Sequence, residues 1–155
     1  MSSIIEVCGD LLDITSGMII HGCNAQGVMG SGIALQLKNK YPGMFSTYVN
    51  DVNLWSQKGT RRHDCLGAVS WHIEGDLVIG SCITQLFYGK DGAKYVSYDA
   101  VDSCAMDVNS MLKSGEFTEL HIPKIGAGLG GGSWNVISEI LTHRIEVPII
   151  CWVKE

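Results

Sequence analysis

Apolar positions along the chain follow two spacings, and these spacings predict an alternation of strands and helices. Nearly continuous apolar runs and short alternating ones indicate strands, and the expected strands are 4–8, 17–24, 68–73, 77–84, 119–122 and 147–153. Apolar residues at helical spacing indicate helices, and the expected helices are 33–41, 45–55, 97–112 and 134–141. This alternation is typical of an α/β fold, here a mixed central sheet flanked by helices on both faces.

Turn residues refine these boundaries. Pro42-Gly43 ends the first expected helix, and Glu74-Gly75-Asp76 predicts a hairpin between the third and fourth strands. Pro148 lies near the start of the last strand, where it would be tolerated if that strand formed an edge of the sheet.

Two glycine-rich segments each follow an expected strand and precede an expected helix. The first is 25–32, and the second, Gly126 to Gly132, has five glycines in seven residues. Glycines let backbone N–H groups approach an oxyanion, and a helix N-terminus adds partial positive charge. Loops after parallel strands share one edge of the sheet, so the pair predicts a diphosphate ligand such as a nucleotide diphosphate-sugar. A flexible linker is disfavoured because apolar patterns bracket the second segment closely, and neither segment is a GxGxxG or GxxxxGK[ST] motif.

Composition narrows the class of protein. The 155 residues suit a single domain over 1–155, and 46% hydrophobic with 17% charged residues is a globular composition. A net charge of −5 argues against general nucleic-acid binding, so backbone amides and helix ends would hold an anionic ligand. No apolar run reaches membrane-spanning length and Met1-Ser2-Ser3 does not begin a signal peptide, so we expect a cytoplasmic protein without membrane contact.

Cysteine spacing predicts buried free thiols, because no two cysteines form a CxxC pair and most lie inside apolar runs. The six are Cys8, Cys23, Cys65, Cys82, Cys104 and Cys151. Neither a zinc site nor a disulfide framework is expected.

Five polar or aromatic residues could carry chemistry, and each has a structural alternative. Asp10 could accept a hydrogen bond from an adenine amino group, although an Asx turn is favoured. His21 is as well explained by a core histidine as by a general acid or base, and Asn24 could bind a sugar hydroxyl or a water. Lys94 could pair with a phosphate or be a solvated loop lysine, and Trp152 could stack on a base or cover the core. The other histidines, His63, His72, His121 and His143, are expected to be structural or at the surface.

Several of these segments together resemble the macro domain, the module that binds ADP-ribose. The matching pieces occur in the order of the family over nearly the whole chain: Gly9-Asp10-Leu11, His21-Gly22-Cys23-Asn24, Met29-Gly30-Ser31-Gly32-Ile33-Ala34, Pro123-Lys124-Ile125-Gly126-Ala127-Gly128-Leu129 and Trp152. Within the family, the chain resembles the branch that contains the yeast ADP-ribose 1″-phosphate phosphatase and the terminal ADP-ribose glycohydrolase of animals. It lacks the Asn-Ala-Ala-Asn and Gly-Gly-Gly-Val motifs of the larger branches.

The resemblance implies a set of ADP-ribose-binding residues. These are Gly9, Asp10, Leu11, Asn24, Ala25, Gly30, Ser31, Gly32, Ile33, Lys124, Ile125, Gly126, Ala127, Gly128, Leu129, Gly130 and Trp152. Asp10 would bind the adenine amino group beside Leu11, and Trp152 would stack on the adenine. Asn24 would lie near the distal ribose, and amides from Ile125 to Gly130 would surround the phosphates.

The resemblance also implies catalytic roles for His21, Asn24 and Lys94. The glycohydrolase branch uses a lysine before the long helix, which Lys94 nearly matches, and an aspartate whose place Gly130 takes. Glycine cannot resolve a covalent lysine adduct by acid–base chemistry, so hydrolysis of ADP-ribose 1″-phosphate is favoured, with His21 transferring the proton and no cofactor or metal. The alternatives are a non-catalytic ADP-ribose reader and a hydrolase that removes ADP-ribose from carboxylate esters of ADP-ribosylated proteins.

Overall fold

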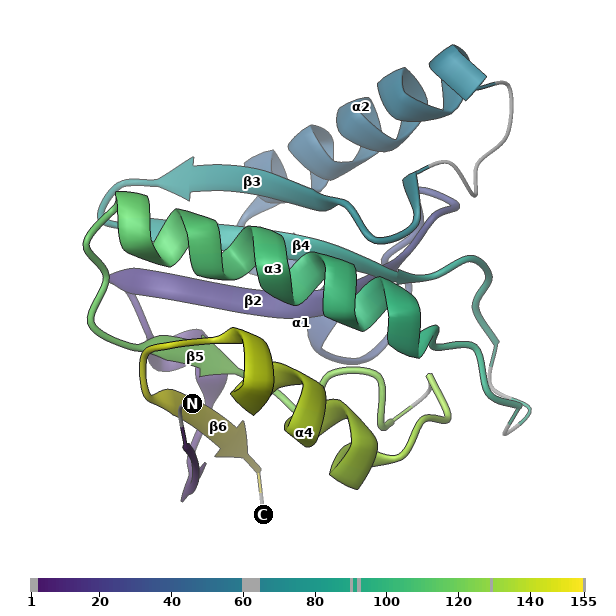
Figure 1. Ribbon diagram of the computed structural model, residues 1–155. Helices are drawn as coiled ribbons and strands as arrows, with labels where there is room; N and C mark the ends of the chain where they lie inside the picture. The colour runs from purple at the N-terminus through teal and green to yellow at the C-terminus, as the bar shows by residue number, and fades with distance from the viewer. Residues whose placement is uncertain (1–2, 60–64, 90, 92, 129, 155) are drawn as a thin grey trace.

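The computed structural model describes residues 3–59, 65–89, 91, 93–128 and 130–154, without the side chains of 57–59. Its elements alternate as expected (Figure 1). In chain order they are β1 (Ile4–Cys8), a 3₁₀ helix η1 (Leu11–Asp13), β2 (Gly17–Asn24), α1 (Gly32–Lys40), α2 (Pro42–Gly59), β3 (Val69–Glu74), β4 (Leu77–Gln85), α3 (Tyr98–Ser114), β5 (Leu120–Ile122), α4 (Trp134–Arg144) and β6 (Ile149–Val153). No helix among these residues is long and apolar enough to cross a membrane.

The six strands form one mixed sheet in the order β1-β6-β5-β2-β4-β3. All neighbouring pairs are parallel except β3 and β4, which form the expected antiparallel hairpin. The expectation of an edge strand at Pro148 is wrong, because β6 lies between β1 and β5. Pro148 is tolerated because it precedes the strand, and its carbonyl oxygen accepts a hydrogen bond from the Leu120 N–H (3.0 Å).

Helices cover both faces of the sheet, as the apolar strands predict. Figure 1 shows α3 and α4 in front of the sheet and α1 and α2 behind it. Alternation along β2 sends Met18 and Ile20 into the core beneath α3 and α4, and Ile19 and Cys23 into the core beneath α1 and α2.

The residues at their N-termini explain where α3 and α2 begin. The Ser97 hydroxyl accepts a hydrogen bond from the Ala100 N–H (3.2 Å) and caps α3. The second helix begins at Pro42, three residues earlier than expected, because a proline lacks the N–H that a first helical residue leaves unpaired. The first helix therefore ends at Lys40, and Tyr41 alone separates the two helices.

The carboxyl ends of the five parallel strands meet at one edge of the sheet. Along this edge lie, in order, the ends of β1, β6, β5, β2 and β4. Both glycine segments follow strands at the middle of the edge, after β5 and β2. Open α/β sheets bind their ligands at this edge, so the fold places both segments where a shared ligand can reach them.

Candidate functional site

A cavity of about 420 Å³ lies at this edge, within the size range of small-molecule sites. Its walls come from four places: the end of β2 (22–24), the first glycine segment with the start of α1 (28–34), the end of β4 with Tyr88 and Gly89, and the second glycine segment with the residues before it. Both glycine segments therefore line one cavity.

The N-terminus of α1 opens into this cavity. Ser31 is the N-cap residue, and its side chain makes no capping hydrogen bond. The first residues of the helix, Gly32, Ile33 and Ala34, line the cavity with Ser31. Unpaired N–H groups and the helix dipole at such an end favour an anion.

The second glycine segment lines another part of the cavity, and backbone hydrogen bonds hold its conformation. The Gly132 N–H donates to the Gly126 carbonyl oxygen (2.8 Å), and the Tyr95 and Val96 N–H groups donate to the Gly130 carbonyl oxygen (2.7 and 3.0 Å). Gly126 has a φ of +73°, and a Cβ there would lie 2.8 Å from Val96 Cγ2, so this position requires glycine. Leu129 lies outside the described residues.

Asn24 lines the cavity and also orders the first glycine segment. Its Oδ1 accepts hydrogen bonds from the Gln26 N–H (2.9 Å) and the Tyr48 hydroxyl (3.1 Å), and its Nδ2 donates to the Val28 carbonyl oxygen (2.7 Å). The side chain therefore shapes the wall that carries Ser31 and Gly32. A direct role for Asn24 toward a sugar or water stays a prediction.

His21 lies in the core and does not line the cavity, which argues against a role as proton donor. It shares the face of β2 with Ile19 and Cys23, packs beneath α2 and is completely buried. Ser81 Oγ lies 2.8 Å from His21 Nε2 and donates to Met44 Sδ (3.4 Å), so the histidine N–H donates to Ser81. The structural alternative for His21 fits this geometry.

Burial lowers the pKa of His21 from its ordinary 6.5 to about 4, and this predicts a loss of stability in acid. Between these pH values the unfolded chain binds a proton that the folded protein does not, so stability is complete above pH 6.5 and falls toward pH 4. We expect His21 to contribute roughly 3 kcal/mol to this fall in the free energy of unfolding.

Urea unfolding from pH 7 to pH 4 measures this contribution. His21→Gln, which keeps a donor for Ser81, should flatten the pH dependence by that amount, and the exposed His143→Gln is the matched control. Equal slopes in both variants would contradict the assignment.

Lys94 also lies outside the cavity lining. Its ammonium sits over the Tyr98 ring, 3.9 Å from the centroid, and the Tyr98 hydroxyl accepts a hydrogen bond from the Ser133 N–H (3.0 Å) at the start of α4. The residue is exposed and next to the second glycine segment. A catalytic role for Lys94 stays a prediction that requires its side chain to leave Tyr98.

The expected adenine residues lie together where β1 and β6 end. Asp10 Oδ1 accepts a hydrogen bond from the Leu12 N–H (3.0 Å), which is the turn anticipated from the sequence, and Oδ2 lies 3.3 Å from Lys154 Nζ. The Leu12 N–H and Lys154 hold the pKa of Asp10 below its usual value. Trp152 is half-buried, rests on the backbone of Gly9 and donates from Nε1 to His121 Nδ1 (3.0 Å).

The remaining expected residues divide between the cavity wall and its surroundings. Those in the wall are Asn24, Gly30, Ser31, Gly32, Ile33, Lys124, Ile125, Gly126, Gly128 and Gly130. Those outside it are Gly9, Asp10, Leu11, Ala25, Ala127, Trp152, His21 and Lys94. The expected set omitted nine wall residues. Six of them lie in segments already singled out from the sequence, namely Gly22, Cys23, Val28, Met29, Ala34 and Pro123. The other three, Gln85, Tyr88 and Gly89, lie at or just after the end of a parallel strand, which is the signal that could have found them.

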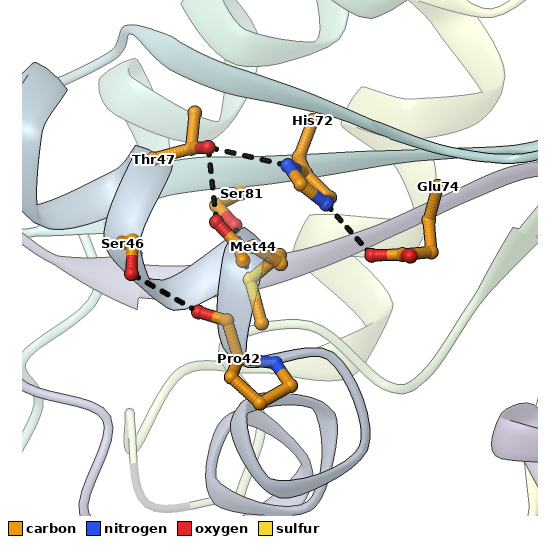
Figure 2. A network of polar contacts seen from close by, with 8 residues as sticks. Pro42, Met44, Ser46, Thr47, His72, Glu74 and Ser81 are labelled. Carbon is orange, nitrogen blue, oxygen red and sulfur yellow. Dashed lines mark hydrogen bonds and ion pairs between the residues drawn. The ribbon is translucent and has the colours of Figure 1, made fainter.

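Two of the other histidines in the described residues, His72 and His121, have structural partners, and His143 is exposed at the surface, as expected. Figure 2 shows His72 between Thr47 Oγ1 (3.2 Å from Nδ1) and Glu74 Oε1 (3.0 Å from Nε2). The contact with Thr47 joins β3 to α2, and the contact with Glu74 lies within β3. His63 lies outside the described residues. No group of three His, Cys, Asp or Glu residues in the described ranges could hold a metal ion.

Five of the described cysteines are buried, as expected, whereas Cys8 is exposed. Burial raises the pKa of the Cys151 thiol to about 11, so this cysteine is held as the neutral thiol.

Similar proteins agree with the fold and differ in the reaction they are named for. An ADP-ribose 1″-phosphate phosphatase of Candida glabrata is 30% identical over 168 residues, covering 91% of this chain and 92% of that protein. A DNA ADP-ribosyl glycohydrolase of Mycobacterium tuberculosis is 25% identical over 151 residues, covering 89% of this chain but 37% of that longer protein. A macrodomain protein from Streptomyces coelicolor has a similar structure, with a TM-score of 0.76, 25% identity and coverage of 97% of this chain and 99% of that one. The family model for the macro domain matches residues 20–141, and the chain belongs to the macro domain family.

Proposed function

We propose that this macro domain binds ADP-ribose and hydrolyses ADP-ribose 1″-phosphate to ADP-ribose and phosphate. The observation that carries the proposal is the single cavity between the open N-terminus of α1 and the amides of the second glycine segment. A diphosphate between these walls would meet amides from both sides. The phosphatase of Candida glabrata, similar over nearly its whole length, supports the choice of substrate.

The order of the strands predicts how ADP-ribose would be oriented along the carboxyl ends of the sheet. Asp10 and Trp152 follow β1 and β6 at one end of the edge, and the two glycine segments follow β5 and β2 at its middle. With adenine near Asp10 and the diphosphate between the glycine segments, the distal ribose and its 1″-phosphate extend toward the end of β4. The reaction would then occur beside Gln85 and Tyr88.

Hydrolysis at this site would rest on the positioning of the reactants and on backbone amides that stabilise the charge of the phosphate. The described residues that line the cavity include no histidine, aspartate or glutamate. Amides at Gly126, Gly128 and Gly130 would stabilise the phosphate charge, and Asn24 would fix the wall opposite them.

Phosphate release from ADP-ribose 1″-phosphate, measured beside calorimetric titration of ADP-ribose, tests the proposal. Turnover together with binding is expected. Binding without turnover would make the protein a reader, and absence of both would reject the site. The glycohydrolase of Mycobacterium tuberculosis motivates a second assay with ADP-ribosylated DNA, where release of ADP-ribose would replace the phosphatase proposal.

Asp10 gives a prediction that separates ligand binding from turn formation. Asp10→Asn keeps an acceptor for the Leu12 N–H, so the turn should persist, whereas the charge at Oδ2 is lost. We expect Asp10→Ala to weaken ADP-ribose binding by about 1–3 kcal/mol and to lower thermal stability as well. Asp10→Asn should weaken binding with stability unchanged.

Calorimetry and thermal unfolding of both variants measure the two effects. An affinity of Asp10→Ala equal to that of the wild type would remove Asp10 from the binding site.

A further inference from the structure

Gln85 presents a fixed acceptor at the end of β4. Its Nε2 donates to the Phe87 carbonyl oxygen (2.7 Å), and since a carbonyl only accepts, this bond fixes which end of the carboxamide is oxygen. The Oε1 atom lies 3.1 Å from the position that a Cβ on Gly130 would take. Both residues line the cavity, so Oε1 is directed at the wall formed by the second glycine segment.

Thr84, the preceding residue, adds a second uncommitted polar atom. Its hydroxyl is buried and has no hydrogen-bond partner among the residues that the structure describes. It lies 3.1 Å from the position of a Cβ on Gly22, which lines the cavity, whereas Thr84 itself lies behind that wall and does not line it. A buried hydroxyl without a partner costs about 1–3 kcal/mol, which a water or ligand hydroxyl reaching it from the cavity would offset.

We propose that Gln85 and Thr84 position the water that attacks the 1″-phosphate. The inference rests on the proposed function, because it needs the 1″-phosphate at the β4 end of the cavity. Neither side chain is a base, so they orient the water and do not deprotonate it.

The reaction balances without another group. The water oxygen forms a bond to phosphorus, and the bond between phosphorus and O1″ breaks. One water proton stays on the released phosphate and the other passes through the phosphate oxygens to O1″. The products are ADP-ribose and hydrogen phosphate, and no oxidant or cofactor is consumed.

Gln26 supplies a matched control. Its Nε2 donates to the Leu86 carbonyl oxygen (3.0 Å), so it tethers the same segment after β4, but its side chain does not line the cavity. Gln26→Met removes a tether alone, whereas Gln85→Met removes a tether and the acceptor with little change in side-chain length.

The experiment measures kcat for phosphate release and Kd for ADP-ribose in both methionine variants and in Thr84→Val. Gln85→Met should lower kcat by about 10- to 100-fold, the scale of a misplaced reactant, with Kd within about threefold of the wild type. Gln26→Met should keep both values within about threefold. Thr84→Val should lower kcat about tenfold while raising or keeping the thermal midpoint, because it removes an unpaired buried hydroxyl.

Each outcome decides between the two proposals. Wild-type kcat in Gln85→Met, an equal loss in Gln26→Met, or a loss of ADP-ribose affinity that matches the loss of kcat would overturn the role of Gln85. Wild-type kcat in Thr84→Val would remove Thr84 from the water site. A wild-type protein that binds ADP-ribose without releasing phosphate would overturn the phosphatase proposal, and the water site with it.

Discussion

Gly128→Val is expected to weaken ADP-ribose binding by at least about 100-fold, close to 2.8 kcal/mol, while the protein stays folded. A Cβ at Gly128 would have no atom within 4 Å, and the backbone there is not left-handed, so the folded chain accommodates valine. The same position lines the cavity, so the branched side chain would stand between the amides and the phosphates.

Calorimetry gives the affinity, and circular dichroism with thermal unfolding reports the fold. Gly128→Ala, which adds a single methyl group, should give an intermediate affinity and serves as the graded control. A folded Gly128→Val protein with wild-type affinity would exclude this segment from the phosphate site.

Gly130→Asp is expected to lose both stability and ligand affinity, although it restores the aspartate of the glycohydrolase branch. A Cβ at Gly130 would lie 2.7 Å from the Gly126 carbonyl oxygen, which is backbone and cannot turn aside. The carboxylate would also lie close to Gln85 Oε1 and to the phosphates of a bound ligand. All of these groups are hydrogen-bond acceptors, so none of them can donate a hydrogen bond to the carboxylate. We expect a loss of about 2 kcal/mol, or roughly 4–8 °C in the thermal midpoint, as for an overpacked core position.

Gly128→Asp is the matched control, because it adds the same charge to the same segment without the steric conflict. Gly128→Asp should unfold at the wild-type temperature and lose affinity through charge repulsion alone. Release of ADP-ribose from an ADP-ribosylated protein ester by a stable Gly130→Asp variant would contradict this account.

The sheet and its ligand edge could be predicted because burial leaves clear marks in the sequence. Strand β2 is almost wholly apolar before Asn24, with His21 the exception, as expected of a strand covered on both faces. The glycine segments follow buried strands closely. These two facts predict the edge of the sheet at which the cavity lies, and the binding of a diphosphate there stays a prediction.

The roles of single side chains depended on packing that the sequence does not contain. Periodicity places His21 on one face of β2 with Ile19, but whether that face meets a ligand or a helix depends on where α2 packs. Gln85 was missed for a similar reason, since the register that pairs Asn24 with Gln85 joins segments far apart in the chain.

The place of β6 inside the sheet has a consequence for how the chain folds. In the described sheet β1 has β6 as its one neighbour, and their register pairs Ile4 with Ile149, almost the full length of the chain apart. Contacts this distant carry a large loop-closure entropy and tend to form late and slowly. We expect the first strand to remain unpaired during synthesis until the last strand is available. Asp10 follows β1 and Trp152 lies in β6. A nucleotide that contacts both residues would therefore protect from hydrogen exchange the part of the sheet that forms last.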